Sequence, residues 1–400
     1  MNPPDADGPV RSPALRRILG TLGAVRFLWD ILGVTLVLLA VLLGLGLGAR
    51  ATWRSLRSRP APASPTAGTP WGPAFEAEFE RSLRMQWHPY VYWRRYPLKG
   101  EFVNVDSSGL RRTILPWPAT PVRRTVFFMG GSTMWGTGQR DGYTIPSLVA
   151  RELGAAGWAG LDIKNFGESG YVFTQEVIQL MLALRDGARP DLVVFYDGIN
   201  DIAAGVMEGR GGLPQNETRR ALEFSIGRLL SRPGWPELRE VIGKASARAQ
   251  GFGRFDPRPL LTSDSATAAL ARSVVDAYLR SAEVVDALAE RYGFRVAYFW
   301  QPSPGTTTKP LTEFERGHWA DSANASLARY LPPVARAAER TVDSAMTRRF
   351  PGRFRSLVTV FNGDTATVWL DDIGHVTEGA NERIARAMLP TILTLLGDRP

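Results

Sequence analysis

Short apolar runs and longer amphipathic stretches alternate through most of this 400-residue chain. Apolar runs rich in Val, Phe, Leu and Tyr are predicted to be buried strands, and they cover Val126–Met129, Leu161–Asn165, Leu192–Tyr196, Arg295–Trp300 and Leu357–Phe361. Stretches with apolar residues at helical spacing are predicted to be helices, and they cover Thr144–Ala156, Thr174–Asp186, Ser265–Tyr292, Trp319–Phe350 (with a break at Pro332-Pro333) and Thr377–Leu396. This alternation predicts an α/β fold with a doubly wound, mainly parallel sheet and helices on both faces.

Residues 202–264 interrupt this alternation directly after the third predicted strand. The segment is rich in glycine and proline, and two helices are predicted within it, around Thr218–Leu230 and Glu237–Arg248. Because it follows the carboxyl end of a strand, it is expected to overhang the ligand side of the sheet as a lid or a substrate-binding cap. An inert surface excursion is the alternative.

An uncharged, apolar stretch of eighteen residues runs from Ile31 to Gly48. A helix that spans a bilayer needs about 20 apolar residues, with a lower limit near 17. We therefore expect a tail over residues 1–30 and an N-terminal transmembrane anchor over residues 31–49. The alternatives are a buried core helix and a signal peptide cleaved near Ala49-Arg50-Ala51, although the run exceeds the roughly 7–15 apolar residues usual in signal peptides.

The residues after this stretch predict how the rest of the chain is divided. Residues 50–72 are rich in Pro, Ala, Ser and Thr, which is typical of a semi-extended linker. Residues 73–121 hold aromatics and turn formers and are expected to pack as an extension on the main domain, residues 122–397. Arginines flank the apolar stretch equally on both sides, so they set no orientation. We expect a linker of this kind to hold an extracytoplasmic domain off the bilayer.

The composition of the chain excludes several kinds of functional site. The chain has no cysteine, which excludes disulfides, cysteine-ligated metals and a thiol nucleophile. Its 48 Lys and Arg exceed 39 Asp and Glu, for a net charge of +9, but the basic residues are scattered or paired, which argues against nucleic-acid binding. Of only three histidines, His88 and His318 are expected to be structural, and no metal or cofactor site is predicted.

Four polar blocks follow predicted strands or precede the last predicted helix. They are Gly130-Gly131-Ser132-Thr133, the segment Asn165–Gly170, the segment Asp197–Asp201, and Asp372-Ile373-Gly374-His375-Val376-Thr377. The carboxyl ends of parallel strands meet at one edge of a sheet, where open α/β sheets place their ligands. We therefore expect the four blocks to converge on a single site.

The residue types in these blocks fit nucleophilic catalysis. Ser132, at a sharp strand-to-helix turn, is the candidate nucleophile, and His375 is the general base that takes its proton. Asp372 can reach back to orient the imidazole and stabilise its charged form; Asp371 and Asp364 are fallback partners. For each residue a structural role is the alternative, with Ser132 as a helix cap and His375 as a helix-entry residue.

An ester carbonyl attacked by a serine acquires a negative charge, and hydrogen-bond donors aimed at that oxyanion lower the barrier. The backbone N–H groups of Ser132 and Gly170 and the side-chain amide of Asn200 can supply three donors. Glycine suits position 170 because no side chain blocks the approach of its backbone. Asn200 could instead be a turn former at the end of its strand.

With these four blocks in this order, the chain resembles the SGNH (GDSL-type) hydrolase family. The matching patterns are Gly-x-Ser, N-x-G-x-x-G, G-x-N-D and a near-C-terminal D-x-x-H, and the resemblance covers roughly residues 122–397. It implies a flavodoxin-like SGNH hydrolase fold with catalytic Ser132, Asp372 and His375, and an oxyanion hole of Ser132, Gly170 and Asn200. The usual Gly-Asp-Ser is Gly-Gly-Ser here, a form similar to secreted or membrane-tethered members linked to cell-surface glycans.

The first functional hypothesis is a membrane-tethered serine ester hydrolase that removes O-acyl groups, with O-acetyl as the first choice, from a carbohydrate or related ester through an acyl-enzyme. Tethering and aromatics such as Trp135, Trp158 and Trp235 are indirect support for an acylated glycan as partner. An O-acyltransferase that modifies a cell-surface or exported polysaccharide is an alternative. A non-catalytic surface module of a polysaccharide-assembly complex is another.

Overall fold

The computed structural model describes residues 32–48, 66, 68–118, 121–230, 261–320 and 325–398. The chain divides into two compact units, residues 1–63 and residues 64–400. In the first unit a helix covers residues 32–48. Among the described residues no helix is long and apolar enough to cross a membrane. The anchor over residues 31–49 therefore stays a prediction, and the tail and most of the linker lie outside the described residues.

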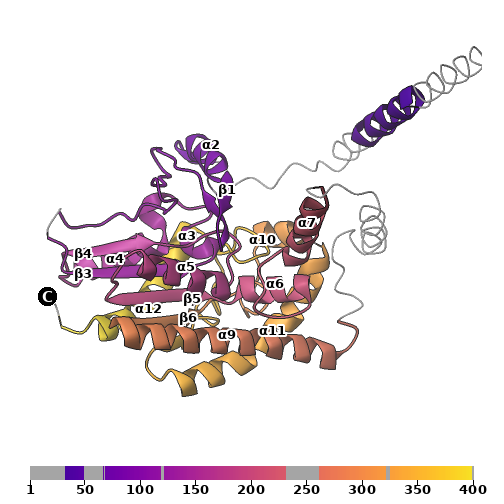
Figure 1. Cartoon of the computed structure of the whole chain (residues 1–400). Coiled ribbons are helices and arrows are strands. Elements are labelled where there is room, and N and C mark those ends of the chain that lie inside the picture. The colour runs from indigo at the N-terminus through magenta and orange to yellow at the C-terminus, as the bar shows by residue number, and fades with distance from the viewer. Residues whose placement is uncertain are drawn as a thin grey trace, which may run out of the picture. The chain divides into compact units, whose positions relative to one another are not determined.

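The second unit is built on a five-stranded, fully parallel sheet (Figure 1). The strand order is β4-β3-β5-β6-β7. The strands are β3 (Arg124–Gly130), β4 (Leu161–Asn165), β5 (Leu192–Asp197), β6 (Arg295–Trp300) and β7 (Phe354–Ser356). In the interior strands β3 and β5 the apolar residues are buried on both faces, as continuous apolar runs predict. The parallel α/β sheet inferred from the sequence is confirmed.

Helices cover both faces of this sheet. Their bounds are α2 (Gly72–Ser82), α3 (Ser132–Trp135), α4 (Ile145–Ala155), α5 (Phe173–Arg185), α6 (Ile199–Glu208), α7 (Glu217–Leu230), α9 (Asp264–Tyr292), α10 (Glu313–Ala320), α11 (Ala325–Arg349) and α12 (Glu378–Leu396), with a short 3-10 helix at Asp141–Tyr143. One core lies between the sheet and helices α5, α6, α9 and α11, and a second lies against α4 and α12. The protein therefore has the two cores of a doubly wound fold.

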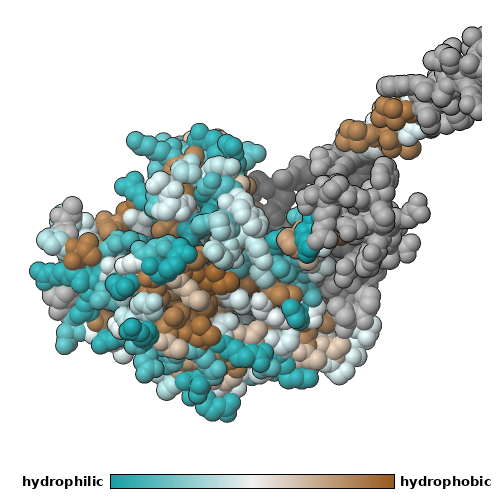
Figure 2. Space-filling view, in the orientation of Figure 1, coloured by the Kyte–Doolittle hydropathy of each residue, from teal (hydrophilic) through white to brown (hydrophobic). Residues whose placement is uncertain are grey.

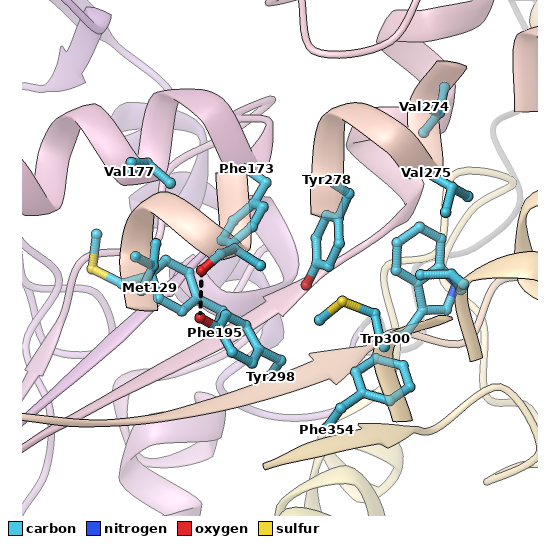
Figure 3. Close-up of a cluster of buried hydrophobic side chains, with 14 of the residues drawn as sticks. Met129, Phe173, Val177, Phe195, Val274, Val275, Tyr278, Tyr298, Trp300 and Phe354 are labelled. Atoms are coloured by element: carbon cyan, nitrogen blue, oxygen red, sulfur yellow. Dashed lines mark hydrogen bonds between the residues drawn. The ribbon is translucent and has the colours of Figure 1, made fainter. Parts of the chain in front are cut away.

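The first core combines aliphatic side chains with a group of aromatic rings in mutual contact (Figure 3). The ring of Phe173 lies 4.3 Å from that of Tyr278, and Phe195 stacks on Tyr298 with a centroid distance of 5.8 Å. Pairs of this kind add about 0.5–1.5 kcal/mol beyond the area they bury. The first pair joins α5 to α9 and the second joins β5 to β6, while Phe173 also contacts Phe195 and Tyr278 contacts Trp300, which ties both helices to the sheet.

Two element predictions were wrong. The last strand ends at Ser356, and Leu357 to Phe361 turn instead, because Leu357 and Phe361 are buried as anchors of that turn. The predicted break at Pro332-Pro333 does not occur, since α11 runs through both prolines while Val334 and Ala338 on it are buried in the core.

The insertion and the extension are described in part. Within residues 202–264 the structure has α7, as predicted, whereas the second predicted helix at Glu237–Arg248 lies outside the described residues. The extension over residues 73–121 contributes most of α2 and an antiparallel hairpin of β1 (Met85–His88) and β2 (Tyr92–Arg95). This hairpin contacts the loop after β4 through Trp93 and Arg95, which matters for the site.

Candidate active site

Ser132 is the first residue of α3, at the point where β3 ends. The two glycines before it are needed for space. A Cβ on Gly130 would lie 2.6 Å from the Cβ of Met134, and a Cβ on Gly131 would lie 2.0 Å from the Nδ2 of Asn200. No real Cβ tolerates contacts this short, so the Gly-Gly pair lets the strand turn into α3 while Asn200 lies directly beside the turn.

Ser132 and His375 are brought together although 243 positions separate them. The Nε2 of His375 lies 2.7 Å from the Oγ of Ser132, within hydrogen-bond reach. The other ring nitrogen, Nδ1, is hydrogen-bonded to the carboxylate of Asp371. A carboxylate, an imidazole and a hydroxyl therefore form one chain of hydrogen bonds.

The prediction that Asp372 orients the imidazole was wrong, and the partner is Asp371. One oxygen of Asp371 accepts hydrogen bonds from the N–H groups of Ile373 (3.0 Å), Gly374 (3.1 Å) and His375 (3.1 Å), which leaves the other oxygen for the imidazole. Gly374 has a φ of +114°, which favours glycine and bends the chain back over that carboxylate. Asp372 instead lines a small cavity together with Ser303 and Pro304.

The electrostatics suit Asp371 for this contact. Burial favours the neutral carboxyl, but the charge of His375 and the hydrogen bonds from its ring and from backbone amides outweigh burial and lower the pKa of Asp371. Asp371 is therefore ionised at neutral pH, as stabilisation of an imidazolium requires. The other fallback, Asp364, pairs instead with Arg383.

The donors predicted for the oxyanion hole come from three separate segments: the start of α3, the loop after β4 and the start of α6. The Nδ2 of Asn200 donates one hydrogen bond to the carbonyl of Tyr171 at 2.9 Å, which fixes the amide beside Gly131 and leaves its second N–H to point elsewhere. Gly170 has a φ of +73°, which favours glycine. Within the described residues, the N–H groups of Ser132 and Gly170 donate to no protein acceptor.

The loop that carries Gly170 packs against the helix that begins at Ser132. Asn165, the last residue of β4, donates from its Nδ2 to the carbonyl of Met134 at 3.0 Å. Its Oδ1 accepts from the N–H of Gly167 at 2.9 Å, and a Cβ on Gly167 would lie 2.3 Å from the backbone nitrogen of Trp135. The glycines of this block therefore permit direct contact between backbones.

The hairpin of the N-terminal extension holds the same loop from outside. We call this contact, made by Arg95 with Glu168 and by Trp93 with Ser169, the clamp. Arg95, fully buried, donates from its Nε to Glu168 at 2.9 Å, and Glu168 also accepts from the N–H of Ser169 at 2.7 Å. The indole of Trp93 donates to the carbonyl of Ser169 at 2.8 Å. Burial raises the pKa of Glu168 and lowers that of Arg95, and their mutual attraction opposes both shifts. No motif in the sequence signalled this clamp, because Arg94-Arg95 looks like any surface pair of arginines.

Two of the three tryptophans that the sequence offered as support for a glycan, Trp135 and Trp158, are buried and form no sugar-binding surface. Trp135 is fully buried, with the guanidinium groups of Arg95 and Arg111 at 4.2 Å and 4.3 Å from its ring. Trp158 is buried as well, and Trp235 lies outside the described residues. This sandwich of a ring between two cations is part of the scaffold that holds α3.

Three acidic side chains are buried together behind Asn200. Asp201 lies on α6 next to Asn200, and its Oδ1 accepts from the N–H of Phe173 at 3.1 Å. Burial raises the pKa of Asp201 to about 7, and burial together with neighbouring acids raises the pKa values of Glu176 and Asp197 well above their ordinary range. These carboxyls are therefore held largely neutral at mildly acidic pH.

Of the other two histidines, only His88 has a side chain that the structure describes, and it takes no part in this site. His88 lies on β1, in the hairpin, and the side chain of His318 lies outside the described residues. Within the described part of the chain, no group of three or more His, Asp or Glu residues could hold a metal ion. The groups that the structure brings together at the site are Ser132, His375, Asp371 and the amides around them.

Residues 128–321 match the family model of the GDSL-like lipase/acylhydrolase family. Among solved structures, a carbohydrate acetylesterase family member from Sinorhizobium meliloti is similar at 16% identity and a TM-score of 0.37, covering 69% of this chain and 100% of that one. An acetylxylan esterase from Geobacillus stearothermophilus is similar at 14% identity and a TM-score of 0.35, covering 68% and 95%. No curated protein matches the chain.

Proposed function

We propose that this chain removes O-acyl groups, above all O-acetyl groups, from a carbohydrate through an acyl-enzyme. The chain belongs to the GDSL-like lipase/acylhydrolase family and is a serine esterase acting on ester bonds. The observation that carries the proposal is the chain of hydrogen bonds from Asp371 through His375 to Ser132. It supplies a nucleophile, a general base and an anion that stabilises the base after protonation.

The reaction begins when the Nε2 of His375 takes the proton of the Ser132 hydroxyl and the Oγ attacks the acetyl carbonyl carbon. The oxyanion receives hydrogen bonds from the N–H groups of Ser132 and Gly170 and from the amide of Asn200, each worth about 2.7–4 kcal/mol in the transition state. When the tetrahedral intermediate collapses, the protonated His375 donates to the sugar oxygen that leaves. Water then attacks the acetyl-Ser132 ester with His375 again as base, and acetate departs.

A cavity beside the oxyanion hole supports the proposal that the alcohol portion of the substrate is polar. It measures about 460 Å³ and is lined by Gly170 together with side chains from the extension and the insertion, among them Trp93, Gln215 and Arg220. The Oε1 of Gln215 lies 3.4 Å from the position of a Cβ on Gly170. An indole, amides and guanidinium groups suit a hydroxylated sugar ring better than a long acyl chain.

The proposal is tested by comparing esters that differ in one portion only. We expect the full chain to hydrolyse 4-nitrophenyl acetate and acetylated xylan, and to hydrolyse 4-nitrophenyl octanoate poorly. Gln215→Ala should lower kcat/KM for the acetylated polysaccharide and leave that for 4-nitrophenyl acetate unchanged. Preference for the octanoate ester, or no release of acetate from any acetylated carbohydrate, would contradict the assignment. Formation of acetylated sugar when a free acceptor is added would favour an acyltransferase.

Attachment to a membrane is a second part of the proposal, supported by the uncharged run from Ile31 to Gly48. Cell fractionation followed by carbonate extraction tests it. We expect the full chain to stay in the membrane pellet, and a chain in which Leu38 and Leu42 are changed to Arg to appear in the supernatant. Release of the unchanged chain by carbonate would contradict the attachment.

A further inference from the structure

A second groove lies between the β1–β2 hairpin and α5, separate from the cavity at Gly170. Its volume is about 690 Å³, within the range of pockets that bind small ligands. The rings at its rim are Trp87 and Tyr90, each with 68% of its surface exposed, and its floor includes Gln179 on α5. We refer to it as the hairpin groove.

The hairpin groove and the active-site cavity use neighbouring residues of the same strand. Trp93 lines the cavity at Gly170, whereas Arg94 lines the hairpin groove. Successive side chains of a strand point to opposite faces, so β2 presents one face to each site. In the view of Figure 2, apolar surface gathers where Figure 1 labels α5 and is bordered by hydrophilic residues.

Two polar atoms in this groove are buried without a partner. The Oε1 of Gln179 accepts no hydrogen bond from the described residues, and only 2% of this residue's surface is exposed. The Nε of Arg94 is likewise buried and unpaired, while its Nη1 donates to the carbonyl of Ser108 at 3.2 Å. A buried polar group without a partner costs about 1–3 kcal/mol, so a ligand that supplies a donor and an acceptor here would gain that free energy.

The charges of the lining nearly cancel, which disfavours a strongly charged ligand. Arg185 is paired with Asp186 at 2.7 Å, and burial, together with the charge of Arg94, lowers the pKa of His88, which favours its neutral form. Arg94 is therefore the one lining cation without a carboxylate partner among the described residues. Anionic lipid surfaces are recognised by clusters of basic residues, which this lining does not have.

The rings at the rim are held out into solvent at a cost. Tyr90 has a φ of +68° and Tyr92 a φ of +76°, in the left-handed region where glycine or asparagine is usual. Trp87 packs against Tyr92 in a tilted arrangement, with a centroid distance of 5.6 Å and an interplanar angle of 42°, while most of the indole remains exposed. Exposed flat rings above unpaired amide and guanidinium atoms combine an apolar platform with hydrogen-bonding groups.

From these observations we infer that the hairpin groove is a second, non-catalytic binding site for a neutral saccharide, with Trp87 and Tyr90 stacking on sugar rings and Gln179 and Arg94 bonding their hydroxyls. No bond is made or broken at this site. It lies beside the hairpin that also clamps the loop of Gly170, so one polysaccharide chain could be held there while an ester at another position reacts.

Binding is tested in the full chain carrying Ser132→Ala, in mild detergent, so that the result is independent of hydrolysis. Isothermal titration uses three neutral hexasaccharides as probes, made of xylose, glucose and mannose. We expect at least one probe to bind. Trp87→Ala should raise the Kd for that probe about tenfold, which corresponds to a loss of roughly 1.4 kcal/mol of binding free energy. Phe224→Ala, which removes another highly exposed ring outside the groove, is the matched control and should leave binding unchanged.

Gln179→Leu and Gln179→Glu separate hydrogen bonding from packing. The leucine variant loses the unpaired acceptor and should bind the probe more weakly, whereas the glutamate variant keeps an acceptor and should bind better than the leucine variant. The inference is overturned if no probe binds, or if Trp87→Ala binds like its parent. It is also overturned if Trp87→Ala abolishes binding to phosphatidylglycerol vesicles while no saccharide binds.

Discussion

The Nδ2 of Asn200 lies where a side chain on residue 131 would begin, 2.0 Å from the position of a Cβ on Gly131. Gly131 has an ordinary φ of −79°, so its backbone does not require glycine. What requires glycine is the closeness of the Asn200 amide, which is held there by its hydrogen bond to Tyr171. The Gly-Gly-Ser block of this chain is therefore matched to the position of an oxyanion-hole donor.

Gly131→Ala should leave the fold intact and impair the reaction. The colliding atom is at the end of a side chain, so Asn200 can move away at little cost in stability, but its donor is then misplaced. We expect kcat for 4-nitrophenyl acetate to fall about 10²- to 10³-fold, as for the loss of one oxyanion-hole donor. Gly142→Ala is the control, since a Cβ there meets nothing within 4 Å. Equal kcat values for the two variants would contradict this role of Gly131.

Substitution of the two neighbouring aspartates, Asp371 and Asp372, should have very different effects on kcat/KM. Asp371→Asn keeps the size of the side chain but loses the charge that orients and stabilises the imidazolium, and we expect kcat/KM to fall on the order of 10⁴-fold. Asp372→Asn should leave kcat/KM unchanged, because Asp372 has no contact with the imidazole. Steady-state kinetics of the two variants decide between them, and the opposite ranking would return the orienting role to Asp372.

The clamp between the hairpin and the loop of Gly170 should support both stability and the reaction. Glu168→Gln leaves the buried guanidinium of Arg95 without its counter-charge, and we expect the free energy of unfolding to fall by about 3–5 kcal/mol. Because the same loop carries Gly170, kcat should fall more than KM rises. Glu223→Gln breaks the exposed pair with Arg219 and should cost at most about 1 kcal/mol. If the two variants are equally stable in denaturant unfolding, the clamp does not hold the loop.

The buried acids behind Asn200 predict how stability depends on pH. The pKa of Asp201 is raised to about 7 in the folded chain, so the folded state binds a proton that the unfolded state releases near pH 4. The bound proton adds to the free energy of unfolding. This stabilisation is complete below about pH 4 and is lost as pH rises through about 7, and the free energy of unfolding falls by at most about 1.4 kcal/mol per pH unit. Chemical unfolding between pH 5 and pH 8 measures it.

Asp201→Asn should reduce that slope, because the amide cannot titrate. Glu339, whose pKa burial also raises to about 7, accounts for another share, so Glu339→Gln should reduce the slope independently. A slope that is unchanged in Asp201→Asn would mean that this carboxyl is ionised in the folded protein.

Much of the fold and part of the site could be predicted from the sequence. Continuous apolar runs such as Leu192–Tyr196 mark a strand that is buried on both faces, and the polar residues that follow it mark the edge where ligands bind. The choice between Asp371 and Asp372 could not be made in this way. It depends on which carboxylate the turn at Gly374 folds back upon, and local spacing permits both.

The clamp and the hairpin groove were beyond prediction for a different reason. Arg95 and Glu168 are 73 positions apart, and nothing in either segment identifies the other as its partner. Their pairing depends on how the β1–β2 hairpin packs on the loop after β4, a tertiary contact that neither hydrophobic period nor turn chemistry encodes. The same holds for Gln179, which looks like an ordinary polar residue of an amphipathic helix.

The central claim is that the hydroxyl of Ser132, activated by His375, is the nucleophile. The most direct measurement is the mass of the full chain after reaction with an alkyl fluorophosphonate, followed by peptide mapping. We predict one adduct, on Ser132, that is missing in Ser132→Ala and forms far more slowly in His375→Ala. An adduct on any other residue, or hydrolysis of 4-nitrophenyl acetate by Ser132→Ala at the rate of the unchanged chain, would contradict the account.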